Sequence, residues 1–365
     1  MSAPIAKPWL FSQTDQDPRS ATGRTLRWGV VATGGIAQSV VQDLVHLADA
    51  ELYAVSSRNQ ATADAFAAKY GFAKAYGEGD SGIGYQRLLA DPAVDVIYVA
   101  TPHAHHYEVA LAALSADKHV LCEKALTINA REAAELVALA RSRKLFLMEA
   151  MWSRFLPSMQ RAFDIAASGE LGAIQWVTAD LGFPAVYSPS ARLWALKDGG
   201  GALLDLTVYP LLWALGTLGF PQTVSATGSV NDDGVDAQNA LTLGYHHGAQ
   251  AQLTSSLTAY GPRAATVAGR LGYLQTIGSV NNPKEIRIRI GMGEPRTEHF
   301  DVVGRGYAYE LREVTRCIQQ GLTESTVMPL EDSLNVMRLF DGVRAQLGVS
   351  YPNDAHHAQS KPATR

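Results

Sequence analysis

Three side chains in two distant segments have the types that acid–base chemistry needs. Lys124 and Glu123 follow the apolar run Val120–Cys122, which is the pattern of a buried strand that ends in a carboxylate and an amine. Asp205 and Tyr209 are four residues apart, a spacing that places both on one face of a helix. A carboxylate, a phenol and a strand-end lysine are what proton transfer coupled to hydride transfer would use. Lys124, Asp205 and Tyr209 are therefore the catalytic candidates.

The chemistry depends on how these groups tune one another. A phenol with an ordinary pKa of about 10 can act near pH 7–8 if an ammonium lies close enough to stabilise the phenolate. We therefore expect Lys124 to lower the pKa of Tyr209. The alternative is structural: Glu123 and Lys124 form a surface pair at a strand exit, Asp205 caps a buried loop and Tyr209 belongs to the core.

A glycine turn near the N-terminus predicts a nucleotide site. It lies between a buried strand pattern, Leu26–Ala32, and an amphipathic stretch, and it matches a relaxed dinucleotide fingerprint with Ala32 at the first glycine position. Gly34 holds the second position, where a side chain would block the backbone from the pyrophosphate. The helix beyond offers free N–H groups to an anion. The cofactor-binding residues predicted here are Thr33, Gly34, Gly35 and Ile36.

The end of the second strand indicates which dinucleotide binds. Ser57 and Arg58 stand there in place of the Asp or Glu that would select NAD through the ribose hydroxyl. An arginine accommodates a 2′-phosphate, so NADP is expected and NAD is less favoured. The alternative is an arginine that is merely solvated at a helix start.

A histidine-rich loop, residues 101–106, follows another strand and would face the nicotinamide half of the cofactor. Thr101, Pro102 and His106 are predicted to contact the cofactor, with His106 packing or hydrogen-bonding near the ring. For His103 and His105 the alternative is that they are polar surface residues without a functional role. No acidic or cysteine ligands accompany these histidines at useful spacing, so no metal site is expected.

The pattern of strands and helices predicts two domains. Up to about residue 150, strands alternate with helices, which indicates a Rossmann-type, doubly wound parallel sheet in the α/β class. Later strands have few helices between them and alternate in polarity, which indicates an α+β domain with a large, open, mostly antiparallel sheet. The predicted divisions are a flexible arm (1–23), a dinucleotide-binding domain (24–150), a substrate-binding and oligomerisation domain (151–351) and a flexible tail (352–365).

Composition excludes several classes of protein. The net charge of −4 provides no basic surface for nucleic acid or for an anionic membrane. Cys122 and Cys317 are the only cysteines, which makes a reducing cytoplasm the simplest location. The N-terminal residues lack the apolar core of a signal peptide. Residues 199–220 are apolar enough for a membrane span, but the central Asp205 favours a buried helix with one functional carboxylate.

These motifs occur together and in an order that resembles the glucose–fructose oxidoreductase and inositol dehydrogenase family of nicotinamide enzymes. The segments Trp28–Ala37, Leu147–Phe155 and Leu204–Pro210 are most similar to the branch of dimeric dihydrodiol dehydrogenases and NADP-dependent D-xylose 1-dehydrogenases. The likeness runs from about Leu26 to Tyr351. Two departures from the wider family follow this branch: Ala125 replaces a proline after Lys124, and Tyr209 replaces a histidine.

The resemblance implies roles for the candidates. Lys124 and Tyr209 would form the acid–base pair, Asp205 would orient a substrate hydroxyl, and Glu123 and Lys124 would also lie at the cofactor. The substrate pocket would be lined by Trp152, Arg154, Phe155 and Arg192. The implied activity is oxidation of a sugar or cyclic diol by NADP⁺ in a homodimer or higher homo-oligomer. A keto-sugar (anhydrofructose-type) reductase, a glucose–fructose-type oxidoreductase and a non-catalytic NADP-binding regulator are the alternatives.

Overall fold

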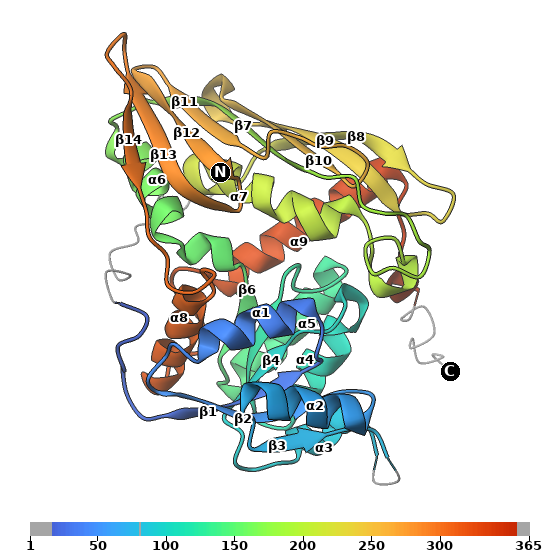
Figure 1. The fold of residues 1–365 in the computed structure, drawn as a ribbon. Coiled ribbons are helices and arrows are strands. Elements are labelled where there is room, and N and C mark those ends of the chain that lie inside the picture. Colours follow the sequence, from blue (N-terminus) through green and yellow to red (C-terminus); the bar gives the residue numbers. More distant parts are fainter. Residues whose placement is uncertain (1–16, 80–81, 356–365) are drawn as a thin grey trace.

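The computed structural model describes residues 17–79 and 82–355, which build two sheets connected by helices. Figure 1 shows the smaller sheet, formed by the N-terminal half, below the larger one. Helices α7 (Val208–Leu218) and α9 (Leu330–Leu347) lie between the two sheets. The two layers therefore meet where the candidate catalytic segments come together.

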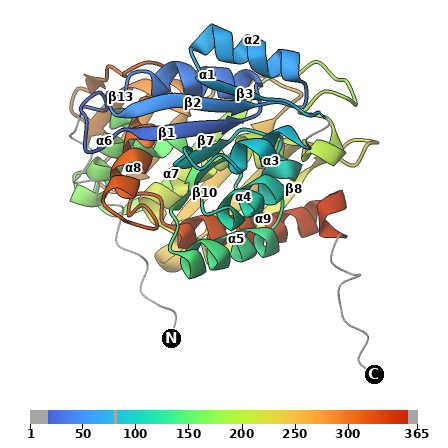
Figure 2. The same cartoon turned by 90° about the horizontal axis from the view of Figure 1, so that it is seen from below.

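The N-terminal sheet is parallel and has six strands in the order β3-β2-β1-β4-β5-β6. This is the strand order of a dinucleotide-binding Rossmann sheet, with a reversal between β1 and β4. The strands are β1 (Leu26–Val31), β2 (Ala50–Ser56), β3 (Lys74–Tyr76), β4 (Val96–Val99), β5 (His119–Glu123) and β6 (Leu147–Ala150). The helices are α1 (Gly35–Leu44), α2 (Gln60–Tyr70), α3 (Gly84–Leu89), α4 (His106–Ser115) and α5 (Ala130–Arg143). Helices cover both faces of this sheet (Figure 2).

Local signals explain where these helices begin and end. The side chains of Asn59 and Asn129 cap α2 and α5 by accepting hydrogen bonds from Thr62 and Glu132 backbone N–H groups. Helix α2 ends at Gly71, whose φ of 84° a residue with a side chain would adopt only under strain. Strands β4 and β5 are almost wholly buried, as expected for a parallel sheet covered on both sides.

The C-terminal sheet has eight strands in the order β14-β13-β12-β11-β7-β10-β9-β8. Every neighbouring pair is antiparallel except β7 and β10, which are parallel. The strands are β7 (Ile174–Gly182), β8 (Thr223–Val230), β9 (Asp236–Gly244), β10 (Gln250–Ser256), β11 (Ala265–Gly269), β12 (Gly272–Ser279), β13 (Asn282–Ile290) and β14 (Arg296–His299). The remaining helices are α6 (Pro157–Ser168) and α8 (Ala308–Gln319). The predicted fold class is confirmed.

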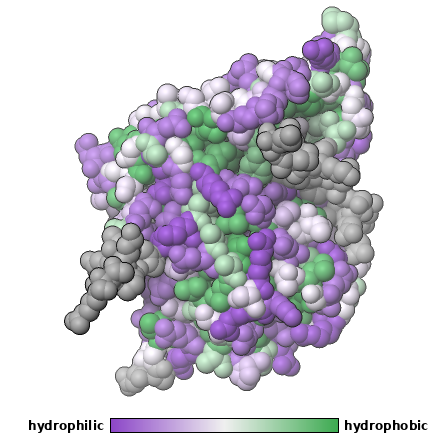
Figure 3. Space-filling model, turned by 180° about the vertical axis from the view of Figure 1, so that it is seen from behind, coloured by the Kyte–Doolittle hydropathy of each residue, from purple (hydrophilic) through white to green (hydrophobic). Residues whose placement is uncertain are grey.

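The larger sheet has two different faces. Helices α6, α7 and α9 lie against its lower face, and its upper face carries none of the described helices (Figure 1). In β7 the side chains of Val177 and Ala179 are buried, so the alternating Trp176, which keeps 40% of its surface exposed, points to the open face. On the face seen from behind, Figure 3 shows hydrophobic residues in patches between hydrophilic ones. The larger sheet therefore has one face covered by helices and one face left open.

Some predicted boundaries were wrong. Residues 17–23, expected in a flexible arm, are held against the fold: Asp49 accepts hydrogen bonds from the backbone of Thr22 and Gly23, and Arg312 of α8 donates to the Pro18 carbonyl. Likewise, Pro352–Asp354 of the expected tail forms a short helical turn. The rest of both tails lies outside the described residues.

Four strands of the structure were not predicted from the sequence: β3, β11, β12 and β14. They are short or have no clean alternation of apolar and polar residues.

The apolar segment near residue 200 is part of the core. Leu196–Leu218 has the length and composition of a membrane span, but 89% of the window is buried inside the fold. It contains a π-helical turn, Leu203–Thr207, which leads directly into α7. The segment thus carries Asp205 and Tyr209 into the interior between the two sheets.

Candidate active site

The site lies beyond the carboxyl ends of β1, β4 and β5, next to the point where the strand order reverses. In open α/β sheets this crevice is the usual ligand position. Strand β5 ends at Glu123, so Lys124 is the first residue beyond it. The π-helical turn and α7 bring Asp205 and Tyr209 to the same place from the C-terminal half. Residues that are 81 positions apart in the sequence are therefore in direct contact.

The glycine turn has the geometry of a dinucleotide cradle. Ala32 has a φ of 89°, in the region that favours glycine, which matches its place at the first glycine of the fingerprint. A Cβ atom built on Gly34 or Gly35 would meet no atom within 4 Å, so the backbone there is open to a ligand. Helix α1 begins at Gly35 without any side-chain cap, and its first N–H groups are available to a phosphate.

Two further observations fit a dinucleotide. The Thr101 hydroxyl is buried without a hydrogen-bond partner among the described residues, at the end of the strand next to β1. Arg58 is exposed just past β2, and no described carboxylate pairs with it. The chain thus offers a free donor near the nicotinamide end and a free cation near the adenosine end.

Lys124 is bound to Asp205. Its Nζ donates to the Asp205 carbonyl at 2.7 Å and to Oδ1 of the same residue at 3.2 Å. Arg192 adds a second cation, with Nη1 2.9 Å and Nη2 3.4 Å from the two carboxylate oxygens. Burial alone would raise the pKa of Asp205, but the Lys124 and Arg192 charges lower it well below its usual range. Asp205 is therefore a fixed anion.

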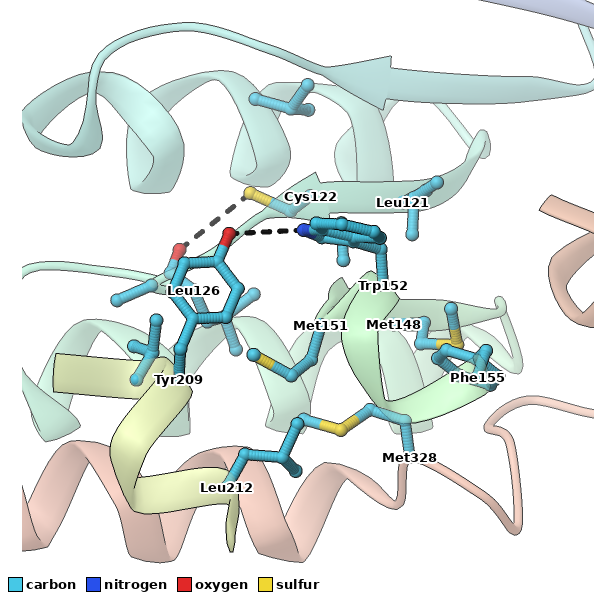
Figure 4. Close-up of a cluster of buried hydrophobic side chains, with 14 of the residues drawn as sticks. Leu121, Cys122, Leu126, Met148, Met151, Trp152, Phe155, Tyr209, Leu212 and Met328 are labelled. Atoms are coloured by element: carbon cyan, nitrogen blue, oxygen red, sulfur yellow. Dashed lines mark hydrogen bonds between the residues drawn. The ribbon is translucent and has the colours of Figure 1, made fainter. Parts of the chain in front are cut away.

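Tyr209 has a different partner from the one expected. Its hydroxyl accepts a hydrogen bond from Trp152 Nε1 at 3.1 Å, and Figure 4 shows the two side chains pointing toward each other. The Lys124 Nζ lies 5.2 Å from the centroid of the phenol ring, and its hydrogen bonds go to Asp205. Burial, with the nearby Glu123 and Asp205 charges, raises the pKa of Tyr209 above 10, although the Trp152 hydrogen bond opposes this. The net direction of the shift is therefore opposite to the lowering that was expected from Lys124.

Two buried histidines hold the backbone on both sides of the candidate lysine. His103 places its ring nitrogens 3.1 Å from the carbonyls of Gly199 and Lys124, and His106 lies 2.9 Å from those of Ala125 and Thr101. Burial lowers the pKa of His103 to about 3 and that of His106 to about 4, so both rings are neutral. The alternative of His103 as polar surface was wrong, because α4 and the Gly199 turn enclose it.

The Glu123 carboxyl binds Tyr98 and not the side chain of a catalytic candidate. Its Oε1 accepts a hydrogen bond of 2.5 Å from the Tyr98 hydroxyl, and its Oε2 lies 3.3 Å from the Lys124 backbone nitrogen. Burial raises the pKa of Glu123 to about 7, against the effects of Tyr98 and Lys124. The carboxyl is thus poised to exchange a proton near neutral pH.

Two residues expected to line the pocket do not reach it. Arg154 is buried, with Nη2 2.6 Å from Asp332 and Nη1 2.9 Å from Met328 Sδ, both on the α9 side. Phe155 is fully buried among core side chains and points away from Tyr209 (Figure 4). The short helical turn Trp152–Phe155 explains this, since neighbouring side chains on a turn leave in different directions. Trp152 and Arg192 do reach Tyr209 and Asp205.

Sequence reasoning missed two supporting residues. Tyr307 stacks against Trp152 with ring centroids 4.6 Å apart, and so fixes the indole that binds Tyr209. Asp236 accepts hydrogen bonds from the Leu203 backbone at 2.7 Å and from Asn239, and so anchors the turn that carries Asp205. Neither has a local sequence signal, because each acts on a segment that is distant in the chain.

Two family models match the chain. Residues 26–151 match an oxidoreductase family with an NAD-binding Rossmann fold, and residues 159–275 match a GFO/IDH/MocA C-terminal domain. Together these ranges include the smaller sheet, strands β7 to β11 of the larger one and every catalytic candidate.

Several characterised proteins are similar over almost their whole length. A trans-1,2-dihydrobenzene-1,2-diol dehydrogenase from Mus musculus is 36% identical, over 90% of this chain and 99% of its own. A D-xylose 1-dehydrogenase (NADP(+)) from Hypocrea jecorina is 33% identical, over 90% of this chain and 93% of its own. The crystal structure of a 3-ketoreductase from Actinomadura kijaniata, in complex with NADP and TDP-benzene, is 28% identical with a TM-score of 0.77, covering 89% of this chain and 98% of that one.

Proposed function

The chain belongs to the Gfo/Idh/MocA family of oxidoreductases, and on that premise we propose that it is an NADP-dependent dehydrogenase of a sugar or cyclic trans-diol. The observation that carries the proposal is the convergence of Lys124, Asp205 and Tyr209 beside an open dinucleotide cradle. The names of the relatives support a carbon–hydroxyl substrate of this kind.

The proposed cofactor site uses the residues that form the crevice. The backbone of Thr33, Gly34, Gly35 and Ile36 would receive the pyrophosphate, and Ser57 with Arg58 would receive a 2′-phosphate. Thr101, Pro102 and Glu123 would border the nicotinamide, while His106 would hold the surrounding backbone. When bound, the nicotinamide supplies the hydride acceptor or donor.

The proposed acid–base residues are Tyr209 and Lys124. Asp205, held as an anion by two cations, would accept a hydrogen bond from a substrate hydroxyl and orient it. Tyr209 would exchange the proton of the reacting oxygen, with its own oxygen positioned by Trp152. Lys124 would place a positive charge beside the phenol as that proton leaves. Positioning and fixed charge of this kind, together with acid–base help of about 10²–10⁴-fold, are what the chain contributes.

A second candidate is reduction of a keto-sugar by the same residues. The raised pKa of Tyr209 favours it, because burial keeps the phenol protonated and able to donate to a carbonyl oxygen. The similar ketoreductase structure supports this direction as well.

One experiment separates these proposals. The purified protein would be screened with NADP⁺ and NAD⁺ against D-xylose, D-glucose and trans-dihydrodiols, and with NADPH against keto-sugars. We expect NADP-linked turnover of at least one aldose or diol. Turnover only with NADPH and keto-sugars would favour the reductase. Cofactor binding without turnover of any substrate would favour a non-catalytic regulator.

We also propose a homodimer that uses the open face of the larger sheet. The exposed Trp176 supports this, since a second copy on the uncovered face would bury this large apolar side chain. A monomer in light scattering at micromolar concentration would contradict it. A cytoplasmic location remains our proposal, supported by Cys122 and Cys317, which are both buried free thiols.

A further inference from the structure

A turn of three glycines, Gly199–Gly201, leads into the segment that presents Asp205. The backbone φ is 78° at Gly199 and 129° at Gly201, values that a residue with a side chain would adopt only under strain. The Gly201 carbonyl accepts a hydrogen bond of 3.4 Å from the Asp205 backbone N–H. The conformation of the turn therefore helps to set where the Asp205 carboxylate lies.

The same turn contacts the segments that present the two cations of the site. The Gly201 backbone N–H donates, at 3.0 Å, to the carbonyl of the residue that follows Arg192. The Gly199 carbonyl lies 3.1 Å from Nδ1 of His103, whose Nε2 lies 3.1 Å from the Lys124 carbonyl. The turn therefore binds the backbone beside Arg192 directly, and it binds the backbone of Lys124 through one buried histidine.

The Tyr351 hydroxyl holds the middle of this turn. It donates to the Gly200 carbonyl at 2.8 Å, and the tyrosine keeps only 2% of its surface exposed. Burial raises the pKa of Tyr351 well above its usual range, so the hydroxyl keeps its proton and stays a donor. A Cβ atom built on Gly201 would lie 3.3 Å from the Tyr351 oxygen, so the phenol packs closely against the turn.

The segment that carries Tyr351 is itself anchored to the N-terminal half of the chain. Asp354 accepts hydrogen bonds from the Tyr351 backbone N–H at 2.9 Å and from the Asn129 side chain, at the start of α5, at 3.0 Å. The Asn353 side chain donates to the carbonyl of Ala104, in the histidine-rich loop, at 3.0 Å. The phenol is therefore fixed to the dinucleotide-binding half while its hydroxyl binds a turn of the other half.

We propose that Tyr351 is a positioning residue for the proposed reaction: its hydroxyl fixes the three-glycine turn, and through that turn it sets the places of Lys124, Asp205 and Arg192. The inference rests on the proposed function, because the reaction is what makes the spacing of these groups matter. Tyr351 acts through the backbone contacts of the turn. A displacement of about 1 Å at a reacting group can cost about 10²-fold in rate, so a hydrogen bond behind the site can have a kinetic effect.

Hydrogen exchange of the full-length protein, measured by mass spectrometry, tests the structural step. Tyr351→Phe removes the hydroxyl and keeps the buried ring, so the backbone amides of residues 196–207 should exchange about 2- to 10-fold faster, the effect of losing one hydrogen bond. Tyr85→Phe is the matched control, because that hydroxyl, on α3, donates to Glu108 of α4 at 2.7 Å. It should leave the exchange of residues 196–207 unchanged. Wild-type exchange of this segment in Tyr351→Phe would overturn the proposal.

Steady-state kinetics test the step from the turn to the reaction. Tyr351→Phe should lower kcat by about 10- to 100-fold and leave the Kd for NADPH unchanged, because the dinucleotide cradle is not part of the turn. Tyr85→Phe should change neither quantity. In an Asp205→Asn background, Tyr351→Phe should lower kcat little further, because both changes affect the same group. Losses that multiply in the double variant, or an unchanged kcat in Tyr351→Phe, would refute the positioning role.

A second variant tests the same anchor if Tyr351→Phe does not fold. Asn353→Ala removes the contact with the Ala104 carbonyl, and it should change the exchange rates and kcat in the same direction by smaller factors. Wild-type values of both would contradict the proposal. If wild type turns over no substrate, the proposed function fails, while the exchange rates still decide whether Tyr351 holds the turn. Faster exchange with a wild-type kcat would leave the proposed function standing and remove the positioning role.

Discussion

The Lys124 ammonium contacts Asp205 twice, at its backbone carbonyl (2.7 Å) and at its carboxylate (3.2 Å), while the Tyr209 hydroxyl is bound by Trp152. The lysine therefore reaches the phenol through space and not through a hydrogen bond. This arrangement separates two tasks, orientation of Tyr209 by Trp152 and stabilisation of charge by Lys124. Each task can be removed by a different substitution.

Replacing Lys124 by methionine should lower kcat/KM by about 10²–10⁴-fold, because the phenolate loses the cation that lies 5.2 Å from the centroid of its ring. Lys118→Met is the control, since Lys118 is a buried lysine at the opposite end of β5 that binds the Asp91 and Val94 carbonyls. That change should lower the Tm while the folded protein keeps its turnover. Steady-state kinetics and thermal unfolding measure both effects. Equal activity of Lys124→Met and wild type would eliminate the charge-stabilising role.

Replacing Tyr209 by phenylalanine should lower kcat by about 10²–10⁴-fold and leave the Kd for NADP almost unchanged, because the hydroxyl serves the reacting oxygen. The control is Tyr307→Phe, which keeps the ring that stacks on Trp152. Single-turnover rates and fluorescence titration with NADPH separate the two quantities. Near-normal turnover of Tyr209→Phe would remove this residue from the mechanism.

Replacing Trp152 by phenylalanine should change the pH profile. Burial raises the pKa of Tyr209 and the Trp152 hydrogen bond opposes this, so losing the indole N–H should raise the pKa further. Oxidation needs the deprotonated phenol, so its rising limb should move to higher pH. Trp194→Phe is the control, because that buried indole binds the Val186 carbonyl and not Tyr209. The idea fails if both variants have the profile of wild type.

Replacing Arg58 by glutamine should weaken NADP binding by about 10- to 100-fold and leave NAD binding unchanged, because a charge-assisted hydrogen bond to the 2′-phosphate is lost. The readout is the Kd for NADPH and for NADH by fluorescence titration. Arg338→Gln removes another exposed arginine, on α9, and should change neither value. An equal loss of affinity for NADPH and NADH would show that Arg58 does not bind the 2′-phosphate.

Replacing Arg154 by methionine should destabilise the fold by about 3–5 kcal/mol, because the Asp332 carboxylate would be left without its cation. The double variant Arg154→Met with Asp332→Leu should recover most of that loss. Denaturant unfolding measures both. If Arg154→Met instead raised KM with no loss of stability, the assignment of Arg154 to the core would be wrong. Arg154 would then line the substrate pocket, as the sequence predicted.

The sequence by itself determined the two-sheet architecture, the glycine turn and the positions of Lys124, Asp205 and Tyr209. These features are encoded locally: strand and helix periodicity, glycines at a tight turn, and residues at the end of a strand. Short or irregular strands such as β11 and β14 were missed for the same reason, since their local pattern is weak.

Only the tertiary structure decided which of these groups touch. Trp152, Arg154 and Phe155 are near neighbours in sequence, yet one binds Tyr209, one binds Asp332 and one fills the core. Burial decided how strongly these groups hold their protons. The pKa of a phenol or carboxyl depends on its exposure to water and on nearby charges, and segments distant in the sequence determine both. For Tyr209 that contribution reversed the expected direction of the pKa shift.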